Sequence, residues 1–456
     1  MLKSKIIFSV VFLLVLSSFA AGEVELKLTT GEIRYFAEDV FMLKLDLDIN
    51  EESGFLGDVY LIVVDPNGSV YFAPEWKQET KTILSNFFFP PSINFQSALI
   101  IEQHIPNRTF PMLNEGEYTF AIGIAMTGTA SFLDIASCIT EYNGEREWMV
   151  INEDDGIETS MLSVVEDRMG EGYWLGSSNK SSIYHYNNVI DKKYVILNGS
   201  AGAINGLVYD NQNRLWAGCY GLHRYNSEED MFDKFIPPFE GEGMNYKATI
   251  SSVLYDLTEN AFWLASLAGL GRFNVQEESW FYYTTEDGLL SDLLYDLEYD
   301  NDNNIWIASL NKDNESFGGV SRFDRINFEN FVFDNPFLTN YMKLGFDSEG
   351  CIWFSTSIIV YRNINGDWIE KGNGLQTGNL KGFYLDRFGR FWCLPDAPMS
   401  ILEPDLLARF EDDLWVPVLT EIKDLGIELC FNMYQDKLNN FWFLGYPKIV
   451  IRWGSE

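Results

Sequence analysis

The stretch Asp210–Asn226 reads DNQNRLWAGCYGLHRYN and holds the pattern that decides the fold. An aspartate opens a polar turn, an apolar run around Trp216 follows, and a second run ends in Arg-Tyr-Asn. Asn213 is a residue type that tolerates the positive φ of a tight turn. The aspartate side chain can hydrogen-bond the backbone of its own turn. The stretch therefore predicts short β-strands joined by hairpins.

This pattern occurs seven times in the chain. Each copy has an aspartate followed by a tryptophan six or seven residues later, and successive tryptophans stand 39 to 50 residues apart. The pairs are Asp167 and Trp174, Asp210 and Trp216, Asp256 and Trp263, Asp300 and Trp306, Asp347 and Trp353, Asp386 and Trp392, and Asp436 and Trp442. Three residues after these aspartates stand Gly170, Asn213, Glu259, Asn303, Gly350, Gly389 and Asn439, six of them Gly or Asn. Four short strands per copy, seven times over, predict a seven-bladed β-propeller rather than a solenoid.

The two ends of the repeat region predict how the ring closes. The chain ends on 449–453, which has the pattern of only the third strand of the seventh copy. The segment 147–152, before the first copy, parallels the fourth-strand segment that begins at Trp280. An unclosed propeller would leave two exposed sheet edges. We therefore predict that 147–152 pairs beside 449–453 and completes the last blade.

The copies resemble a known repeat. The pattern Asp-x-x-Gly/Asn-x-Leu-Trp-x-Gly-x, followed by Gly-Leu-x-Arg-Tyr-Asn, is similar to the two-component regulator propeller repeat, and Asp210–Asn226 is its best copy. The resemblance covers residues 145–453 and implies a periplasmic sensor propeller of the kind found in bacterial hybrid histidine kinases. Copies four and six carry insertions, 310–317 and 395–404, which we expect to form loops on one face.

Residues 23–140 lack the repeat. They contain strand-like runs at 40–45, 59–64 and 118–122, and Asp65–Gly68 has the composition of a hairpin turn. These features predict an immunoglobulin-like β-sandwich. The whole chain is therefore expected to be all-β, with this sandwich at 23–140 and the propeller at 141–456.

The first residues of the chain and its net charge indicate where the protein is located and what it binds. Lys3 and Lys5 precede the apolar run 6–16, and small residues follow, which is typical of a secretory signal peptide at 1–22. No later run is long enough to span a bilayer. The 32 basic and 67 acidic residues give a net charge of −35, which disfavours binding to nucleic acid. We expect an exported protein, periplasmic, cell-surface or extracellular, with an unidentified ligand or protein partner there.

The sequence offers few candidates for metal-binding or catalytic residues. Asp300, Asp302 and Asn304 offer oxygen ligands at alternate positions, as calcium loops do, but Asn311 stands where such a loop has its glutamate. A plain turn is the favoured interpretation, and no cofactor other than calcium is considered. His185 and His223 lie in third strands of the first two copies and could bind metal or act as bases. No acidic residue recurs beside them, so a structural role is favoured, and no catalytic residue is predicted.

Three functions are open from the sequence. The favoured one is a non-catalytic, sensor-type propeller that binds a ligand or partner, because no nucleophile–base or metal-ligand constellation is recognisable. The second is a propeller enzyme of lyase or lactonase type, with a metal held by acidic residues in the channel. The third is an envelope or adhesion scaffold.

Overall fold

The computed structural model describes the chain from residue 23 to residue 454 with gaps. The gaps are 31–33, 36–39, 51–52, 75, 79–81, 105–114, 130–131, 143–146, 198–201, 239–247, 311–317, 334–341, 357–358, 374, 376–379, 396–406, 418–424 and 447–448. The signal segment at 1–22 lies outside the described residues, as do the predicted insertions apart from Leu310 and Pro395. The described chain forms two compact units, one built from β1 to β9 and the other from the repeats. None of the helices in the described part is long and apolar enough to cross a membrane.

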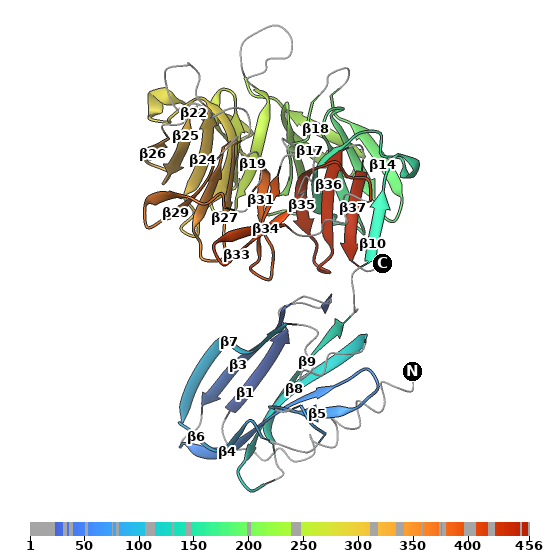
Figure 1. Cartoon of the computed structure of the whole chain (residues 1–456), viewed down its shortest axis with the longest axis vertical. Coiled ribbons are helices and arrows are strands. Elements are labelled where there is room, and N and C mark those ends of the chain that lie inside the picture. The colour runs from blue at the N-terminus through green and yellow to red at the C-terminus, as the bar shows by residue number, and fades with distance from the viewer. Residues whose placement is uncertain are drawn as a thin grey trace. The chain divides into compact units, whose positions relative to one another are not determined.

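The first unit is a pair of facing sheets (Figure 1). β1 (Glu23–Thr30), β3 (Val40–Asn50) and β7 (Ser92–His104) form one sheet. The other has the order β2 (Arg34–Tyr35), β9 (Phe132–Tyr142), β8 (Gly116–Met126), β4 (Phe55–Val64) and β5 (Val70–Phe72), with β6 (Leu84–Phe89) also paired to β4. The three strand-like runs predicted from the sequence fall in β3, β4 and β8.

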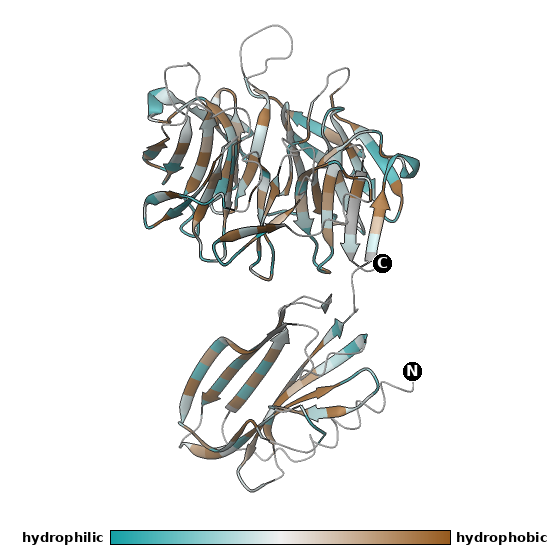
Figure 2. Ribbon diagram, in the orientation of Figure 1, coloured by the Kyte–Doolittle hydropathy of each residue, from teal (hydrophilic) through white to brown (hydrophobic). Residues whose placement is uncertain are grey.

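Alternation along the strands builds the core of this unit. Phe41, Leu43, Leu47 and Ile49 of β3 are buried, and the hydropathy bands on β1, β3 and β7 in Figure 2 follow the same period of two. Phe41 stacks on Phe120 of β8 with ring centres 4.6 Å apart. The two sheets therefore bury their apolar faces against each other.

The second unit consists of four-stranded antiparallel sheets, which we number in chain order. The described residues contain seven of them. The first is β11 (Met161–Glu166), β12 (Tyr173–Ser177), β13 (Ser182–Tyr186) and β14 (Ile190–Val195); the second is β15 (Gly206–Tyr209), β16 (Leu215–Cys219), β17 (Gly221–Asn226) and β18 (Met231–Phe235). The third is β19 (Ile250–Asp256), β20 (Ala261–Ser266), β21 (Gly269–Asn274) and β22 (Ser279–Tyr283); the fourth is β23 (Leu293–Tyr299), β24 (Ile305–Leu310), β25 (Gly319–Phe323) and β26 (Phe328–Val332). The fifth is β27 (Lys343–Phe346), β28 (Ile352–Ser355), β29 (Val360–Ile364) and β30 (Asp367–Glu370); the sixth is β31 (Leu380–Leu385), β32 (Phe391–Pro395), β33 (Ala408–Glu411) and β34 (Leu414–Pro417). The seventh has the order β35 (Leu429–Gln435), β36 (Phe441–Tyr446), β37 (Ile449–Gly454) and β10 (Glu147–Ile151).

These sheets are arranged as a propeller. The strands β11, β15, β19, β23, β27, β31 and β35 contact one another in turn, and β35 also contacts β11. Figure 1 shows the sheets standing side by side around a common centre. The prediction of an all-β propeller is confirmed.

The seventh sheet combines strands from both ends of the repeat region. β10 is hydrogen-bonded to β37 as the outermost strand of this sheet. A short turn at Glu153–Asp155, capped by Asn152 and ended by Gly156, follows β10, and a turn with the same capping box at Thr285–Asp287 follows β22. β10 thus has the surroundings of a fourth strand, as β22 has in the third sheet.

Each repeat turn is held by its aspartate. In six sheets the tryptophan indole Nε1 donates to the Asp Oδ2 atom: Trp216 to Asp210 at 2.9 Å, Trp263 to Asp256 at 3.4 Å, Trp306 to Asp300 at 3.0 Å, Trp353 to Asp347 at 2.7 Å, Trp392 to Asp386 at 2.9 Å and Trp442 to Asp436 at 3.0 Å. The other carboxylate oxygen accepts backbone N–H groups of the turn, such as Gln212 N and Arg214 N on Asp210. One carboxylate therefore fixes both the hairpin and the tryptophan that packs between sheets.

The positive-φ position of the turn agrees with the sequence in five copies and differs in two. Asn213, Asn303, Gly350, Gly389 and Asn439 have φ between 58° and 78°, as expected three residues after the aspartate. In the first and third copies the residues with positive φ are Gly172 (105°) and Asn260 (47°), not Gly170 and Glu259. Tryptophan follows aspartate after seven residues in these copies and after six in the others. The extra residue lengthens the turn and moves the left-handed position towards the second strand.

We predict that Asp347→Ala destabilises the protein by about 3 kcal/mol, because the buried Trp353 N–H loses its acceptor and the Arg362 guanidinium keeps only Glu349 as a partner. Urea unfolding followed by circular dichroism would measure this. Asp302→Ala, at an exposed position of the equivalent fourth turn, is the control and should leave the free energy of unfolding almost unchanged. Equal destabilisation by both variants would contradict the role assigned to the Asp–Trp bond.

Candidate functional site

β-Bulges shape the inner wall of the ring. The innermost strands of five sheets each skip one residue in their register with the next strand, and the skipped residues are Leu162, Ser251, Tyr295, Lys381 and Phe431. All five residues line one central cavity of about 550 Å³, together with Asn205 and Lys343 from the two unbulged inner strands and their flanks. A bulge re-aims the side chain of its extra residue. The bulges therefore direct side chains from around the ring into one channel.

Several polar side chains of the channel wall join neighbouring sheets. Asn432 donates to the carbonyl of Leu162 at 2.9 Å, across the junction between the seventh and first sheets. Asn205 donates to the carbonyl of Ile250 at 2.7 Å. Asp296 accepts from Leu344 N at 3.1 Å. These contacts rigidify the wall, so the channel is a formed cavity whose remaining polar atoms can face a ligand.

Charged groups of both signs line the channel. Asp296 and Glu298 are two residues apart on β23 and therefore project from the same face. Lys343 Nζ lies 3.6 Å from Asp296 Oδ1. Burial raises the pKa of Glu298 to about 8, with a further contribution from the negative charge of Asp296. At neutral pH Glu298 therefore carries a proton and can donate a hydrogen bond.

Aromatic rings stand beside these charges. Lys381 Nζ lies 5.9 Å from the centre of the Phe431 ring, and Tyr295 and Phe383 also line the channel. Flat apolar faces next to hydrogen-bonding groups are the surfaces on which sugars and peptides are held. Sequence reasoning did not single out these residues, because the bulges that bring them together interrupt the repeat pattern by one residue each.

The candidate calcium ligands are parts of a repeat turn. Asp300 Oδ1 accepts from Asp302 N at 3.0 Å and from Asn304 N at 2.8 Å, and Oδ2 accepts from the Asn304 amide at 2.8 Å as well as from Trp306. Both carboxylate oxygens thus have protein donors. Within the described ranges, no group of three His, Cys, Asp or Glu residues is placed to hold a metal ion.

The two candidate histidines have separate surroundings. His223, on β17, is buried with Nε2 3.2 Å from the Tyr220 carbonyl, and burial lowers its pKa to about 4. His185, on β13, lies between two carboxylates: Nδ1 is 2.7 Å from Asp191 Oδ1, and Nε2 is 3.3 Å from Asp167 Oδ2. Acidic residues thus lie beside His185 but do not recur at His223; Asp191 comes from the next strand and Asp167 from the preceding turn.

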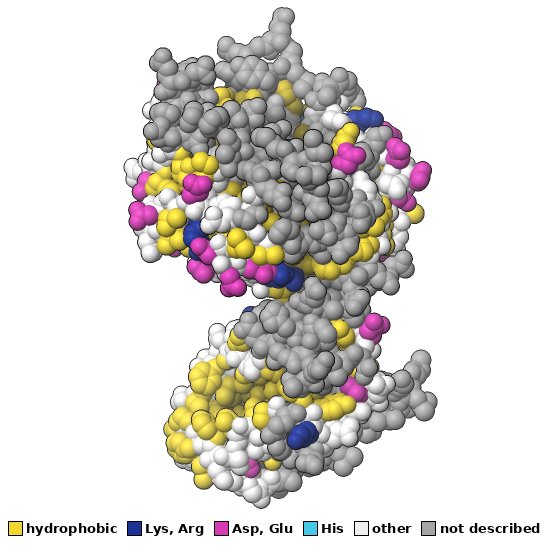
Figure 3. Space-filling view, viewed as in Figure 1, with side chains coloured by type: hydrophobic (Ala, Val, Ile, Leu, Met, Phe, Trp, Pro, Cys, Tyr) yellow, Lys and Arg dark blue, Asp and Glu magenta, His cyan; other side chains and the backbone are white. Residues whose placement is uncertain are grey.

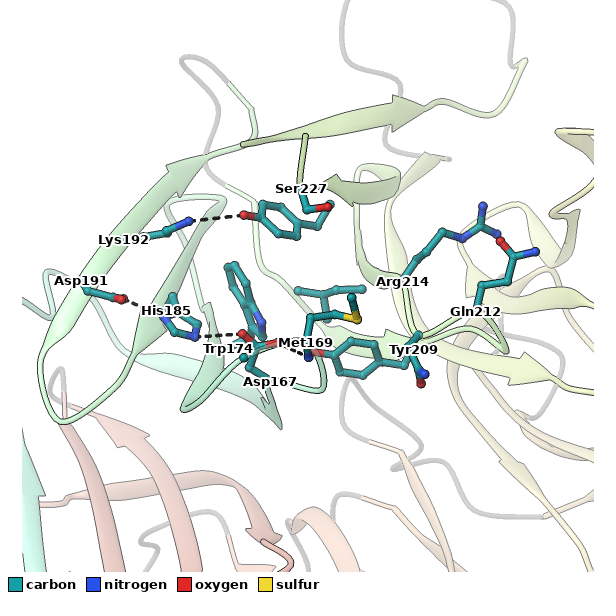
Figure 4. Close-up of a pocket in the computed structure, with 14 residues that line it drawn as sticks. Asp167, Met169, Trp174, His185, Asp191, Lys192, Tyr209, Gln212, Arg214 and Ser227 are labelled. Carbon is teal, nitrogen blue, oxygen red and sulfur yellow. Dashed lines mark hydrogen bonds and ion pairs between the residues drawn. The ribbon is translucent and has the colours of Figure 1, made fainter. Parts of the chain in front are cut away.

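His185 also lines a second pocket, of about 380 Å³, between the first and second sheets (Figure 4). Trp174, Tyr209 and Tyr225 form aromatic walls of this pocket, and Lys192 and Arg214 reach it from β14 and from the turn after β15. The pocket lies beside the tryptophan of the first repeat.

Known structures share this fold at low sequence identity. No protein-family model and no curated protein matches the sequence. The extracellular domain of the hybrid two-component system BT4673 from B. thetaiotaomicron matches 96% of the chain at 14% identity and a TM-score of 0.51. That of BT3049 from the same organism matches 90% at 15% identity and a TM-score of 0.50. YCF48 bound to D1 peptide matches 68% at 12% identity and a TM-score of 0.51, over 97% of its own length.

These similarities establish the β-propeller fold. The chain spans 59% and 54% of the lengths of the BT4673 and BT3049 domains. Both are extracellular domains of hybrid two-component systems, which agrees with the resemblance of the repeats to the two-component regulator propeller.

The raised pKa of Glu298 predicts a specific pH dependence of stability. The ordinary glutamate pKa of 4.5 applies to the unfolded chain and about 8 to the folded one. Between these values the folded state binds the proton more tightly, so the free energy of unfolding falls as the pH rises. Glu298→Gln should remove this fall. Relative to the wild type, the variant should gain in free energy of unfolding as the pH rises from 4.5 to above 8.

Urea unfolding at a series of pH values would measure the difference. Glu370→Gln, at an exposed position on β30, is the control and should track the wild type at every pH. A constant difference between Glu298→Gln and the wild type across the series would show that Glu298 is not protonated in the folded channel.

Proposed function

We propose that this chain is an exported, non-catalytic binding protein in which a seven-bladed, sensor-type β-propeller follows an immunoglobulin-like β-sandwich, and that its ligand occupies the central channel. The observation that carries the proposal is the convergence of bulge residues from five sheets on one cavity. A bulge interrupts the pairing ladder. Its repetition around the ring favours a surface built for recognition over one built only for stability.

The lining chemistry favours a polar ligand of modest size. Protonated Glu298 offers a donor and an acceptor, Lys343 and Lys381 offer charged donors, and Phe383 and Phe431 offer apolar faces. Such a set suits an oligosaccharide or a short peptide. YCF48, a propeller of similar fold, is bound to a peptide, so peptides belong among the candidates.

An exported location and a sensing role are parts of the same proposal. The extracellular domains of BT4673 and BT3049 share the fold, and the sequence begins with the pattern of a signal peptide. The strongly acidic composition keeps an exported protein soluble. A propeller that holds a ligand in its channel would report that ligand to a partner protein.

One observation favours the scaffold alternative. The first unit exposes large apolar side chains on three strands: Leu56 on β4, Leu84, Phe87 and Phe88 on β6, which pairs with β4, and Phe95 and Leu99 on β7 of the other sheet, all at least 43% exposed. Figure 3 shows hydrophobic side chains gathered on this unit. Large exposed apolar patches mark docking sites. The sandwich is thus a second candidate for partner binding, independent of the channel.

A thermal-shift screen with oligosaccharides and peptides would test the channel. A ligand that binds the folded state raises the melting temperature with its concentration. Lys381→Ala should abolish the rise, because its side chain points into the channel from a bulge. Lys234→Ala, exposed on β18, removes the same charge elsewhere and should retain it.

Two results would go against this function. A shift that survives Lys381→Ala would place the ligand outside the channel. Turnover of a lactone or glycan substrate that depends on a metal and disappears in Glu298→Gln would favour the enzyme alternative.

A further inference from the structure

The second pocket occupies the place where the first repeat departs from the others. In five sheets an arginine on the third strand stands directly opposite the repeat tryptophan: Arg224, Arg272, Arg322, Arg362 and Arg409. Their guanidinium carbons lie 5.5 to 5.9 Å from the tryptophan ring centres. Each guanidinium also contacts a carboxylate, namely that of Asp233, Glu259, Asp300, Asp347 or Glu411. The repeat therefore surrounds a guanidinium with one indole face and at least one acid.

In the first sheet this guanidinium is missing while its surroundings are retained. His185 stands opposite Trp174, at the position that arginine has in those five sheets. The imidazole is shorter than an arginine side chain and lies over the Trp174 ring with centres 4.7 Å apart. The carboxylates of Asp167 and Asp191 are both present, and the pocket opens beside them (Figure 4).

His185 stands between the two carboxylates: Nδ1 lies 2.7 Å from Asp191 Oδ1, and Nε2 lies 3.3 Å from Asp167 Oδ2. Nε2 makes no hydrogen bond within the described protein, although the His185 side chain is only 9% exposed. An imidazole has at most two N–H groups, whereas the guanidinium that it replaces has five. The two carboxylates therefore keep acceptor positions for further donors.

The charges around the pocket favour a cation. Lys192 and Arg214 line it, but Lys192 Nζ is 2.9 Å from Asp230 and Arg214 Nε is 2.6 Å from Asp210. Each of these cations is therefore neutralised by an acid outside the lining. Asp167 and Asp191, by contrast, share one imidazole ring, that of His185. The local excess is negative, and so is the chain as a whole, at −35.

We propose that this pocket binds the guanidinium group of an external arginine side chain, which completes the first repeat from outside. Its N–H groups would donate to the carboxylates of Asp167 and Asp191, and its plane would lie against the aromatic wall formed by Trp174 and Tyr225. A peptide or protein that presents an exposed arginine has this chemistry, and so has free arginine. The site is separate from the central channel and does not depend on the function proposed for it.

Isothermal titration calorimetry with acetyl-Gly-Arg-Gly-amide would test the proposal. Saturable one-to-one binding to the wild type is expected. The peptide with citrulline in place of arginine has the same shape and no charge, so it should bind at least about tenfold more weakly, a loss of about 1.4 kcal/mol. Free L-arginine, titrated in parallel, distinguishes a peptide-borne guanidinium from the free amino acid.

Two variants and one control locate the site. His185→Arg supplies the guanidinium internally, so it should abolish binding and raise the melting temperature. Asp191→Asn leaves the pocket open but removes one charge, so binding should weaken about tenfold. Asp302→Asn removes an exposed charge in the fourth sheet and should bind like the wild type.

Three outcomes would overturn the proposal. They are no binding to the wild type, equal binding of the citrulline peptide, and undiminished binding by His185→Arg. The charged groups facing this ring or lining its pocket are Asp167, Asp191, Lys192 and, from the second sheet, Arg214.

Discussion

The hydrogen bond from a buried tryptophan to the aspartate that begins its hairpin is the interaction on which the propeller depends. The carboxylate satisfies the turn backbone with one oxygen and the indole N–H with the other. The tryptophan is thereby oriented so that its ring packs against the neighbouring sheet, as Trp216 does against Phe262. Because the same bond recurs around the ring, local turn chemistry and packing between sheets are set by one residue pair per repeat.

Most of the propeller could be predicted from the sequence, because the aspartate and the tryptophan lie in one hairpin and their spacing is local. The turns of the first and third copies could not be placed correctly, since one extra residue shifts the left-handed position to Gly172 and Asn260. The arginine that stands opposite the tryptophan in five sheets was visible in the Gly-Leu-x-Arg pattern. Its role emerged only from the register of the second and third strands.

The candidate site was largely hidden from sequence reasoning for a different reason. Channel residues such as Tyr295 and Phe431 come from bulges in separate sheets, and a bulge shifts the alternation that identifies buried positions. Glu298 has a raised pKa because it is buried in the channel wall and because the negative charge of Asp296 lies on the same strand. His185 could be seen in the sequence, but Asp167 and Asp191 are brought to it by the hairpins on either side of β12 and β13. Comparison among the seven repeats is what distinguishes this site from an ordinary buried histidine.

The position of β10 beside β37 has a consequence for how the chain folds. The two strands pair across about three hundred residues of intervening sequence, and such distant contacts are slow to form because the closure entropy precedes any gain from pairing. During synthesis β10 leaves the ribosome long before β37. The hydrogen-bonding edge of β10 therefore stays without this strand while the other sheets form. The ring therefore closes through β10 and β37, which are the first and the last strands of the propeller to be synthesised. Closure comes late, and after it no sheet can leave the ring without breaking contacts on both sides.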